Sequence, residues 1–291
     1  MSDSMIDPVL WTDWHVVAEV EGLRRGRPLA TTLLGVPLRV AWQADTVVVT
    51  RGDREQIHVD TRYGFVWVCL GSPAHRIIDI PEASETGRCV TTGGSFGVHV
   101  SAPRVIENFL DLGHLPHVHR DYLGAEPHTE VQSYDVQPLP GGGIVATGCK
   151  IFQPIASPAA QGGYVVDYIY KVVRPLITCL YKANPIRTDG FDIIYLFAQP
   201  VDEEHAIAHA LILFLADGTS TKDLRWFQQL IFLQDKPILE NQFPKRLPIG
   251  PRMEMAVLAD KSSIAYRRWL AEIGLRYGTI GGPGGAEPMA A

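Results

Sequence analysis

Six apolar runs of strand length fill the sequence between residues 128 and 216, and they constrain the fold more than any other feature. Gly, Pro, Asp or Asn residues separate successive runs, which is typical of strands joined by turns. The runs are HTEVQSYDVQPL, GGIVATGCKIF, GGYVVDYIYKVVRP, LITCLYKANPI, GFDIIYLFAQPV and EHAIAHALILFLA. They predict one large antiparallel sheet, and a further strand is expected over residues 95–100.

A second, smaller β unit is expected before this sheet. Residues 14–70 alternate short apolar runs with turn residues, which is the pattern of a small antiparallel unit. Residues 73–85 are Pro-rich and irregular, as in a joint between domains. We therefore predict one domain over residues 1–74, a larger domain over 75–280 and a disordered tail over 281–291.

Helices are expected at three places, so the fold class is α+β. Apolar residues recur at helical spacing within residues 103–124, which indicates a helix. Pro116 has no N–H for the helical hydrogen-bond ladder, so we expect a kink or break between His114 and His119. The other two helices are expected over residues 222–242 and 260–276.

Composition and charge argue against two classes of partner. A net charge of −6 without a dense Lys/Arg cluster is unlike the basic surface of nucleic-acid-binding proteins. The longest apolar stretch, residues 206–216, is too short to span a bilayer and contains His209. The segment MSDSMIDPVLWTDWH has acidic residues where a secretion signal has a basic start. We expect a cytoplasmic protein with no nucleic-acid and no membrane partner.

The cysteines indicate neither a disulfide framework nor a cysteine-ligated metal. They are widely spaced and form no CxxC or CxH motif. We expect four reduced and mostly buried thiols, at Cys69, Cys89, Cys149 and Cys179.

Three of the ten histidines fall within six residues, at His114, His117 and His119. Two neutral imidazoles and one carboxylate on one face of an iron(II) ion are the donor set of many non-haem oxygenases, because the other positions stay open for oxygen and substrate. On an unbroken helix, residues five apart point in different directions. The expected break at Pro116 would let His114 and His119 converge, although such a pair is by itself more often two surface or core histidines.

The surrounding residues carry a family resemblance. Residues 107–119, ENFLDLGHLPHVH, resemble the motif Asn-x2-Asp-x2-His-x4-His of the Rieske non-haem iron oxygenase α subunits. The branch that contains vanillate and dicamba O-demethylases is the most similar. Residues 232–242, FLQDKPILENQ, are similar to the downstream segment in which that family carries its third iron ligand, an aspartate.

The resemblance implies roles for five residues. His114, His119 and Asp235 would bind one mononuclear iron(II). Asp111 matches the bridging aspartate, which implies a hydrogen bond to His114 that fixes its tautomer and helps to carry an electron, whereas a capping or solvent-facing acid is the plainer interpretation. Asn108 is a candidate for lining the site, with a core hydrogen bond as the simpler alternative.

The resemblance extends over nearly the whole chain. Residues 260–270 look like the family's closing helix, and WHVV at 14–17 with LLG at 33–35 resembles the opening of its Rieske domain. It implies a helix-grip catalytic domain over residues 75–280, in which a curved antiparallel sheet surrounds a long helix. A truncated Rieske-type β domain would precede it over residues 1–74.

The iron–sulfur ligands of the family are the main departure. A Rieske cluster needs two Cys and two His, which the family supplies as CxH and CxxH. Neither motif occurs here, and Cys69 is followed by Leu, Gly and Ser. We therefore expect no [2Fe–2S] cluster in this chain. In this respect the chain resembles a cluster-lacking member of the family, a methylxanthine N-demethylase subunit.

This resemblance implies an oxygenase that hydroxylates the N- or O-methyl group of a small aromatic or heterocyclic compound, which then releases formaldehyde. Electrons would come from a Rieske-bearing oxygenase subunit and a separate flavin or ferredoxin reductase. The family also implies a trimer or hetero-hexamer.

Three other functions stay open: an aromatic-ring hydroxylase subunit, a non-catalytic structural or regulatory subunit of a hetero-oligomer, and a helix-grip ligand-binding protein. Retention of all three ligands and of Asp111 argues against the non-catalytic subunit, because a purely architectural chain does not need them. We assign His117 to packing or the pocket rim, and His205 and His209 to the sheet or the pocket lining. Glu240 and Gln242 are expected to serve structure.

Overall fold

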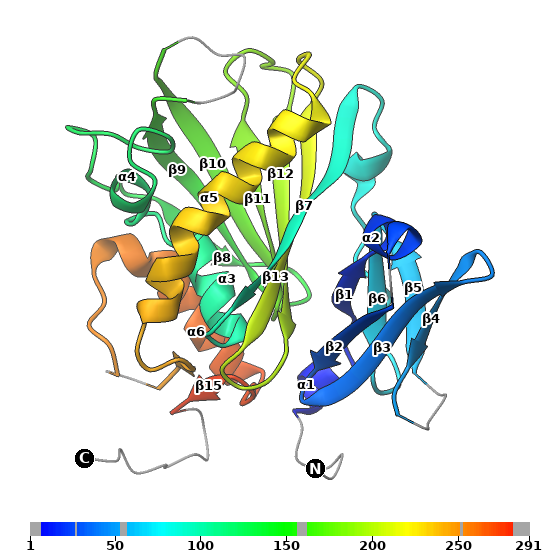
Figure 1. Cartoon of the computed structure of the whole chain (residues 1–291). Coiled ribbons are helices and arrows are strands. Elements are labelled where there is room, and N and C mark those ends of the chain that lie inside the picture. The colour runs from blue at the N-terminus through cyan, green and yellow to red at the C-terminus, as the bar shows by residue number, and fades with distance from the viewer. Residues whose placement is uncertain (1–6, 27, 53–56, 156–161, 251–252, 282–291) are drawn as a thin grey trace.

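A seven-stranded antiparallel sheet is the centre of the fold (Figure 1). The computed structural model describes residues 7–26, 28–52, 57–155, 162–250 and 253–281. The strand order is β7-β13-β12-β11-β10-β9-β8. The strands are β7 (Arg88–Val98), β8 (Asp135–Pro138), β9 (Ile144–Gln153), β10 (Tyr164–Arg174), β11 (Ile177–Ala183), β12 (Phe191–Pro200) and β13 (Ala206–Leu215). The predicted large sheet is confirmed, and the strand expected at residue 95 begins earlier, at Arg88.

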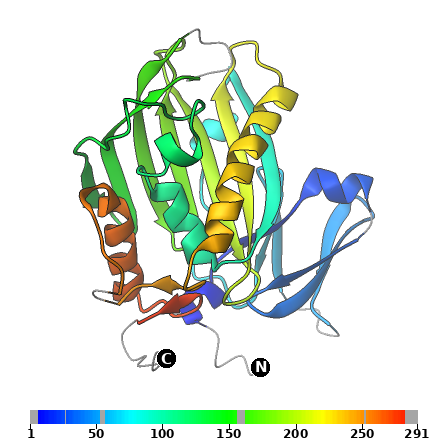
Figure 2. The ribbon, with the colours of Figure 1, turned by 60° about the vertical axis from the view of Figure 1, so that its left-hand side comes forward.

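Three helices lie on one face of this sheet (Figure 2). They are α3 (Ala102–Leu110), α5 (Thr221–Asn241) and α6 (Lys261–Glu272). Serine hydroxyls cap two of them, since Ser101 accepts from the amide of Arg104 and Ser220 accepts from the amide of Asp223. The α+β class is confirmed, and the position of α5 across the sheet is consistent with the expected helix-grip fold.

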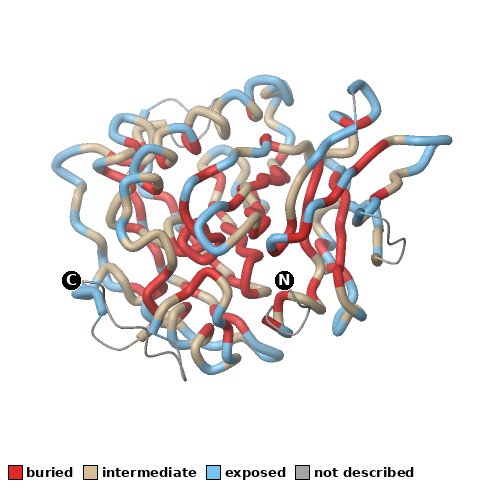
Figure 3. The backbone as a smooth tube through the Cα atoms, turned by 60° about the horizontal axis from the view of Figure 1, so that its bottom comes forward, coloured by how far each residue is buried: buried red, intermediate tan, exposed pale blue. Residues whose placement is uncertain are grey.

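The N-terminal β unit packs on the opposite face. It contains two three-stranded sheets, built from β1 (His15–Glu19), β6 (Phe65–Cys69) and β5 (His58–Arg62), and from β2 (Leu29–Leu33), β3 (Val36–Gln43) and β4 (Thr46–Thr50). Phe65 and Trp67 share one apolar cluster with Phe197 and Leu211 of the large sheet. Buried backbone therefore runs through both parts (Figure 3). The boundary at residue 74 stays a prediction.

Short elements complete the described chain. They are α1 (Pro8–Trp11), α2 (Val20–Arg25), the 3-10 turns Pro81–Ser84 and Leu258–Asp260, α4 (Leu115–Val118), β14 (Leu247–Pro248) and β15 (Thr279–Ile280). The four cysteines are free thiols, as expected. Among the described helices, none is long and apolar enough to cross a membrane. The predicted disordered tail lies, from residue 282 on, outside the described residues.

The helix expected over residues 103–124 is wrong in one respect. Helix α3 already ends at Leu110, and a turn leads to the separate short helix α4. Pro116 lies in the first turn of α4, where a missing N–H leaves no intrahelical bond unmade. The break is thus upstream of the proline, between Asp111 and His114.

Candidate metal centre

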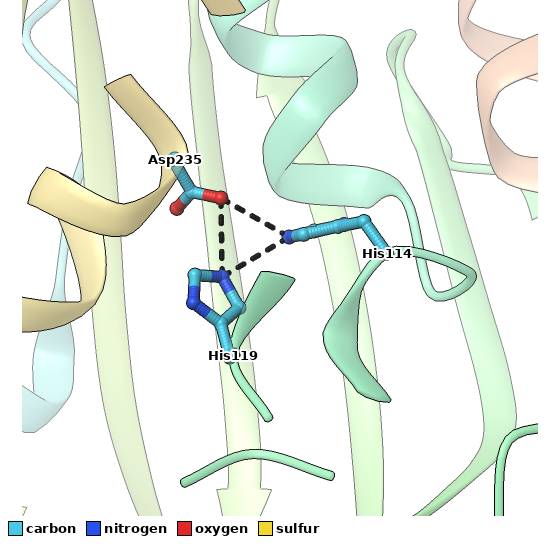
Figure 4. Close-up of side chains that lie close together, drawn as sticks. All are labelled: His114, His119 and Asp235. Carbon is cyan, nitrogen blue, oxygen red and sulfur yellow. Dashed lines mark hydrogen bonds and ion pairs between the residues drawn. The ribbon is translucent and has the colours of Figure 1, made fainter. Parts of the chain in front are cut away.

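Three side chains from two distant parts of the sequence converge on one point (Figure 4). Asp235 points from α5 toward His114 and His119. The Nε2 atom of His114 lies 3.2 Å from Nε2 of His119 and 3.2 Å from Oδ1 of Asp235. The Nε2 atom of His119 lies 3.1 Å from the same carboxylate oxygen. His119 and Asp235 are buried, and His114 is nearly so. The structure thus brings together all three residues that the sequence resemblance pairs.

The turn between α3 and α4 positions both imidazoles. Asp111 is the C-cap residue of α3, and its Oδ1 accepts a hydrogen bond of 2.8 Å from the amide of Gly113. Its other oxygen, Oδ2, lies 3.2 Å from Nδ1 of His114. His119 follows one turn later, as the C-cap of α4. The hydrogen bond predicted between Asp111 and His114 is present.

Both imidazoles present Nε2 lone pairs to the centre of the triad. Nδ1 of His114 donates to the Asp111 carboxylate, and Nδ1 of His119 donates to Oε1 of Gln234 at 2.9 Å. A neutral imidazole has one donor nitrogen and one acceptor nitrogen, so each Nε2 is the acceptor. The buried Oδ1 of Asp235 has no hydrogen-bond partner among the described residues. With both imidazoles neutral, three electron-pair donors would face one another, so this arrangement calls for a proton or a metal ion between them.

Electrostatics favour a positive charge at this point. Burial alone would lower the pKa of His114, but the carboxylates of Asp111 and Asp235 outweigh it and raise that pKa to about 9. Burial would raise the pKa of Asp235, but the two imidazoles overcome this effect and lower it to about 2. The site therefore stabilises a cation, either a proton on His114 or a metal ion that replaces it.

The donor set fits a divalent transition metal. Near-equal edges of 3.1–3.2 Å match one face of an octahedron. The bonds of such an octahedron would be about 2.2 Å long, close to those of imidazole and carboxylate ligands. Two histidines and one carboxylate on a face are the ligands of non-haem iron(II) oxygenases, which leave the opposite face open. Gln234 and Asp111 would hold the imidazoles in the required tautomer.

An apolar cavity opens from the triad between α5 and the large sheet. Six aromatic side chains line it: Phe109, Phe214, Phe227, Phe232, Tyr168 and Tyr170. Asn108 also lies in the wall of this cavity. Its position suits the predicted lining role, which stays a prediction. The cavity volume is about 80 Å³. An engineered cavity that binds benzene measures about 150 Å³, so a ring-sized ligand requires lining side chains to move.

The remaining histidines lie away from the triad. His117 is exposed on α4, so it is neither packed nor part of the cavity wall. His209 is buried on the opposite face of the sheet, where Ser95 and Gln199 bind its two ring nitrogens. His205 precedes β13 and pairs with an aspartate of the preceding loop.

The two polar residues that follow Asp235 on α5 have separate surroundings. Glu240 accepts from the amide of His99 and pairs with Lys236 at 2.7 Å. Gln242 is the C-cap residue of α5 and lines a surface hollow beside Asp111. Neither residue lines the triad cavity.

Sequence reasoning missed three polar residues of this site. Gln234 orients His119, and its only signal is its place beside Asp235 on the helix. Tyr170 and Lys182 line the cavity from β10 and β11. A tyrosine and a lysine within strand patterns are ordinary, so the sequence alone marks neither residue as part of the site.

Comparisons with known proteins agree on one family. The family model described as the vanillate O-demethylase oxygenase C-terminal domain matches residues 98–276. A probable methylxanthine N7-demethylase of Pseudomonas sp. (strain TJI-51) is 42% identical over 272 residues, which cover 93% of this chain and 96% of that protein.

More distant relatives share the same fold. The methylxanthine N1-demethylase NdmA of Pseudomonas putida is 25% identical over 75% of this chain, a match that spans 61% of that protein's length. The structure of NdmA with caffeine superposes with a TM-score of 0.72 over 91% of both chains, at 21% identity. The structure of dicamba monooxygenase bound to dicamba superposes with a TM-score of 0.67 at 16% identity. The match covers 91% of this chain and 97% of the dicamba monooxygenase chain.

Proposed function

The chain belongs to the Rieske-type oxygenase family that includes vanillate O-demethylase, and on that premise we propose that it is the oxygenase subunit of an N- or O-demethylase. His114, His119 and Asp235 would hold one mononuclear iron(II) ion. One observation carries the assignment: three inward-facing donor atoms lie 3.1–3.2 Å apart, and the buried Asp235 oxygen has no hydrogen-bond partner among the residues described. Such an arrangement is costly unless a cation occupies it.

The chemistry divides between the ion and the chain. Iron(II) bound there would supply the activation of O2. The chain contributes a mostly apolar cavity beside the triad. This cavity would limit the access of water and orient a methyl group toward the three donor atoms. In the balanced reaction, one oxygen atom enters the C–H bond of the methyl group, and two electrons and two protons reduce the other atom to water. The resulting hydroxymethyl group leaves its nitrogen or oxygen as formaldehyde.

Electrons would come from another protein. The sequence has no CxH or CxxH pair for a Rieske cluster, so we assign that role to a partner oxygenase subunit served by a flavin or ferredoxin reductase. We assign the receipt of the electron to Asp111. Its side chain is 33% exposed and opens on a surface hollow, whereas its Oδ2 lies against His114.

The surface around this hollow is suited to docking. Met255 lines the hollow and is 95% exposed, and Leu258 is 86% exposed two residues before Asp260 of the same wall. Exposed apolar side chains that gather on one surface are typical of interaction sites. A trimer or hetero-hexamer that places a Rieske domain at Asp111 would satisfy this arrangement.

The substrate is a small aromatic or heterocyclic compound with a methyl group. Most of the cavity lining is aromatic or aliphatic, which suits a flat ring. The relative at 42% identity is a probable methylxanthine N7-demethylase, so N-methylated purines are the first compounds to test.

Reconstitution tests the proposal directly. The chain is purified without oxygen, loaded with iron(II), and combined with a Rieske-bearing oxygenase subunit and its reductase. Oxygen uptake and formaldehyde release are then followed with 7-methylxanthine. We expect equal amounts of oxygen consumed and formaldehyde released, and neither with His114→Ala.

Three outcomes would contradict separate parts of the proposal. Formaldehyde release with a reductase but no Rieske protein would refute the electron supply. A ring-hydroxylated product without formaldehyde would assign the chain to the ring hydroxylases instead. Failure of the wild-type chain to bind iron, with no effect of His114→Ala on the assembled complex, would indicate a structural subunit.

A further inference from the structure

Lys182 is a buried cation in the wall of the triad cavity. It lies near the end of β11, and its residue is only 6% exposed. On a strand, residues two apart share a face, and Leu180 lines the same cavity. Tyr168, the cross-strand neighbour of Lys182 on β10, also lines it. The ammonium group is therefore carried by the sheet face that meets α5.

The natural partner of this lysine is engaged elsewhere. Asp192 pairs with Lys182 across β11 and β12. Its Oδ1 accepts from the amide of Leu215 at 2.9 Å, and its Oδ2 accepts from the side-chain amide of Asn184 at 2.9 Å. Within the described ranges, Lys182 makes no hydrogen bond and no ion pair within 4 Å. Burial accordingly lowers its pKa to about 8, an effect that Asp192 only partly offsets.

A buried ammonium group without a hydrogen-bond acceptor costs stability. Proteins tolerate such a cost at functional sites, where a ligand supplies the missing partner. The rest of the lining offers few polar groups near the lysine, because most of it is aliphatic or aromatic. Lys182 could therefore donate a strong hydrogen bond to an acceptor atom of a bound ligand, and this bond would fix the orientation of the ligand.

Strand register gives the position of the lysine along the cavity. Tyr170, opposite Leu180 on the neighbouring strand, lines the same cavity as His114 and Asp235. Lys182 is one two-residue step further along β11, which is about 7 Å. A bicyclic ring spans about one such step, so a ring that lies beside Tyr170 can reach the level of Lys182.

We propose that Lys182 is a specificity-determining residue that donates hydrogen bonds to an oxygen on the substrate ring, opposite the methyl group presented to the triad. This inference rests on the proposed function and narrows its substrate class. The substrate carries a carbonyl, phenolate or carboxylate oxygen on the side of the ring distant from the methyl group. A methylated ring without such an oxygen binds more weakly.

Binding measurements with matched ligands and variants test the assignment. The full iron-loaded chain is titrated anaerobically by calorimetry with 7-methylxanthine, which has two ring carbonyls, and with 7-methylpurine, which has none. Lys182→Met removes the charge at similar length, and Leu180→Met is the control on the same face. We expect Lys182→Met to weaken 7-methylxanthine binding by about 10- to 100-fold, the range for a hydrogen bond to a charged group. Binding of 7-methylpurine should be weak and equal in both proteins.

Caffeine separates the two kinds of acceptor. It keeps the carbonyls but has no ring N–H to ionise, so a large Lys182→Met effect on both ligands indicates a neutral carbonyl. An effect on 7-methylxanthine alone indicates an ionised oxygen. Either result supports the proposal, because each places the acceptor at Lys182.

Thermal unfolding excludes a purely structural role. Lys182→Met should keep or raise the melting temperature, because it removes a buried unpaired charge. Unchanged 7-methylxanthine affinity, or a fall in both affinity and melting temperature, would overturn the inference. If the wild-type chain binds no methylxanthine, the substrate class fails. In that case 4-methoxybenzoate and methoxybenzene form the corresponding pair with and without an oxygen anion, and equal effects of Lys182→Met on both would again overturn the role of Lys182.

Discussion

The two faces of the large sheet differ in whether their buried polar groups have hydrogen-bond partners. On the face toward the N-terminal β unit, both ring nitrogens of His209 have partners, at 2.8 Å from Ser95 and 3.0 Å from Gln199. Between this sheet and α5, Oδ1 of the buried Asp235 has no hydrogen-bond partner among the described residues, and Lys182 lines the same cavity. Both faces are buried, so burial alone does not distinguish them.

The difference identifies function better than residue type does. A buried imidazole bonded on both sides serves packing, since no valence is left for a ligand. An imidazole bonded only through Nδ1, with Nε2 directed at other electron-pair donors, is prepared for a cation. Four substitutions would break or sharpen this contrast.

Substitution of a triad histidine should have the largest effect. His119→Ala removes one of three donors, so iron content should fall to the level of a metal-free control and formaldehyde release to the assay background. Metal analysis and the reconstituted assay measure these changes. Full iron content with full turnover in His119→Ala would show that the triad is not the metal site.

Substitution of the residue that orients His114 should have a smaller effect. Asp111→Asn keeps a side-chain oxygen near His114 but loses the charge, and we expect turnover to fall about 10- to 100-fold with most of the iron retained. Stopped-flow absorbance of the reduced Rieske partner follows electron delivery. Our role for Asp111 is wrong if electron delivery at saturating partner matches the wild-type rate.

The structural histidine should affect stability and its pH dependence. Burial lowers the pKa of His209 to about 3, so below pH 6.5 the unfolded chain binds a proton that the folded chain does not. Stability is therefore lost as pH falls from about 6.5 toward 3, by about 3 kcal/mol between pH 7 and 4.5 from this group alone. In urea unfolding, His209→Gln should show a shallower loss over that range. A loss as steep as in the wild type would contradict the assignment.

The smallest effect is expected at the third histidine of the cluster. His117 is exposed on α4, so His117→Ala should leave iron content and turnover unchanged and alter stability by less than about 0.5 kcal/mol. The same iron and formaldehyde measurements apply. Loss of iron in this variant would mean that the segment's fold, and not its donor atoms, controls metal binding.

Patterns that repeat over many residues could be predicted from the sequence. The strands of the large sheet and the helix from residue 221 to 241 follow from periodicity and punctuation. The turn after Leu110 could not be predicted in this way. The apolar spacing continues through Leu112 and Leu115, although the backbone is no longer helical after Leu110. Asp111 ends the helix by a local hydrogen bond to Gly113, a side-chain effect that periodicity does not register.

The candidate site divides in the same way. The two histidines are close in sequence, so their spacing was informative. Asp235 is more than a hundred residues away and was found only through the family resemblance. Tyr170 and Lys182 could not be found, because strand alternation does not say which face will meet α5 or whether a buried lysine will have a partner.

The placement of the triad ligands on two distant segments also affects how the chain unfolds. An ion bound by His119 and Asp235 would be a removable cross-link, closing a loop of more than a hundred residues between α4 and α5. Such a link is absent from the unfolded ensemble, so occupancy would favour the native state by mass action. Loss of the ion would therefore weaken the packing of α5 against the sheet and also abolish the reaction.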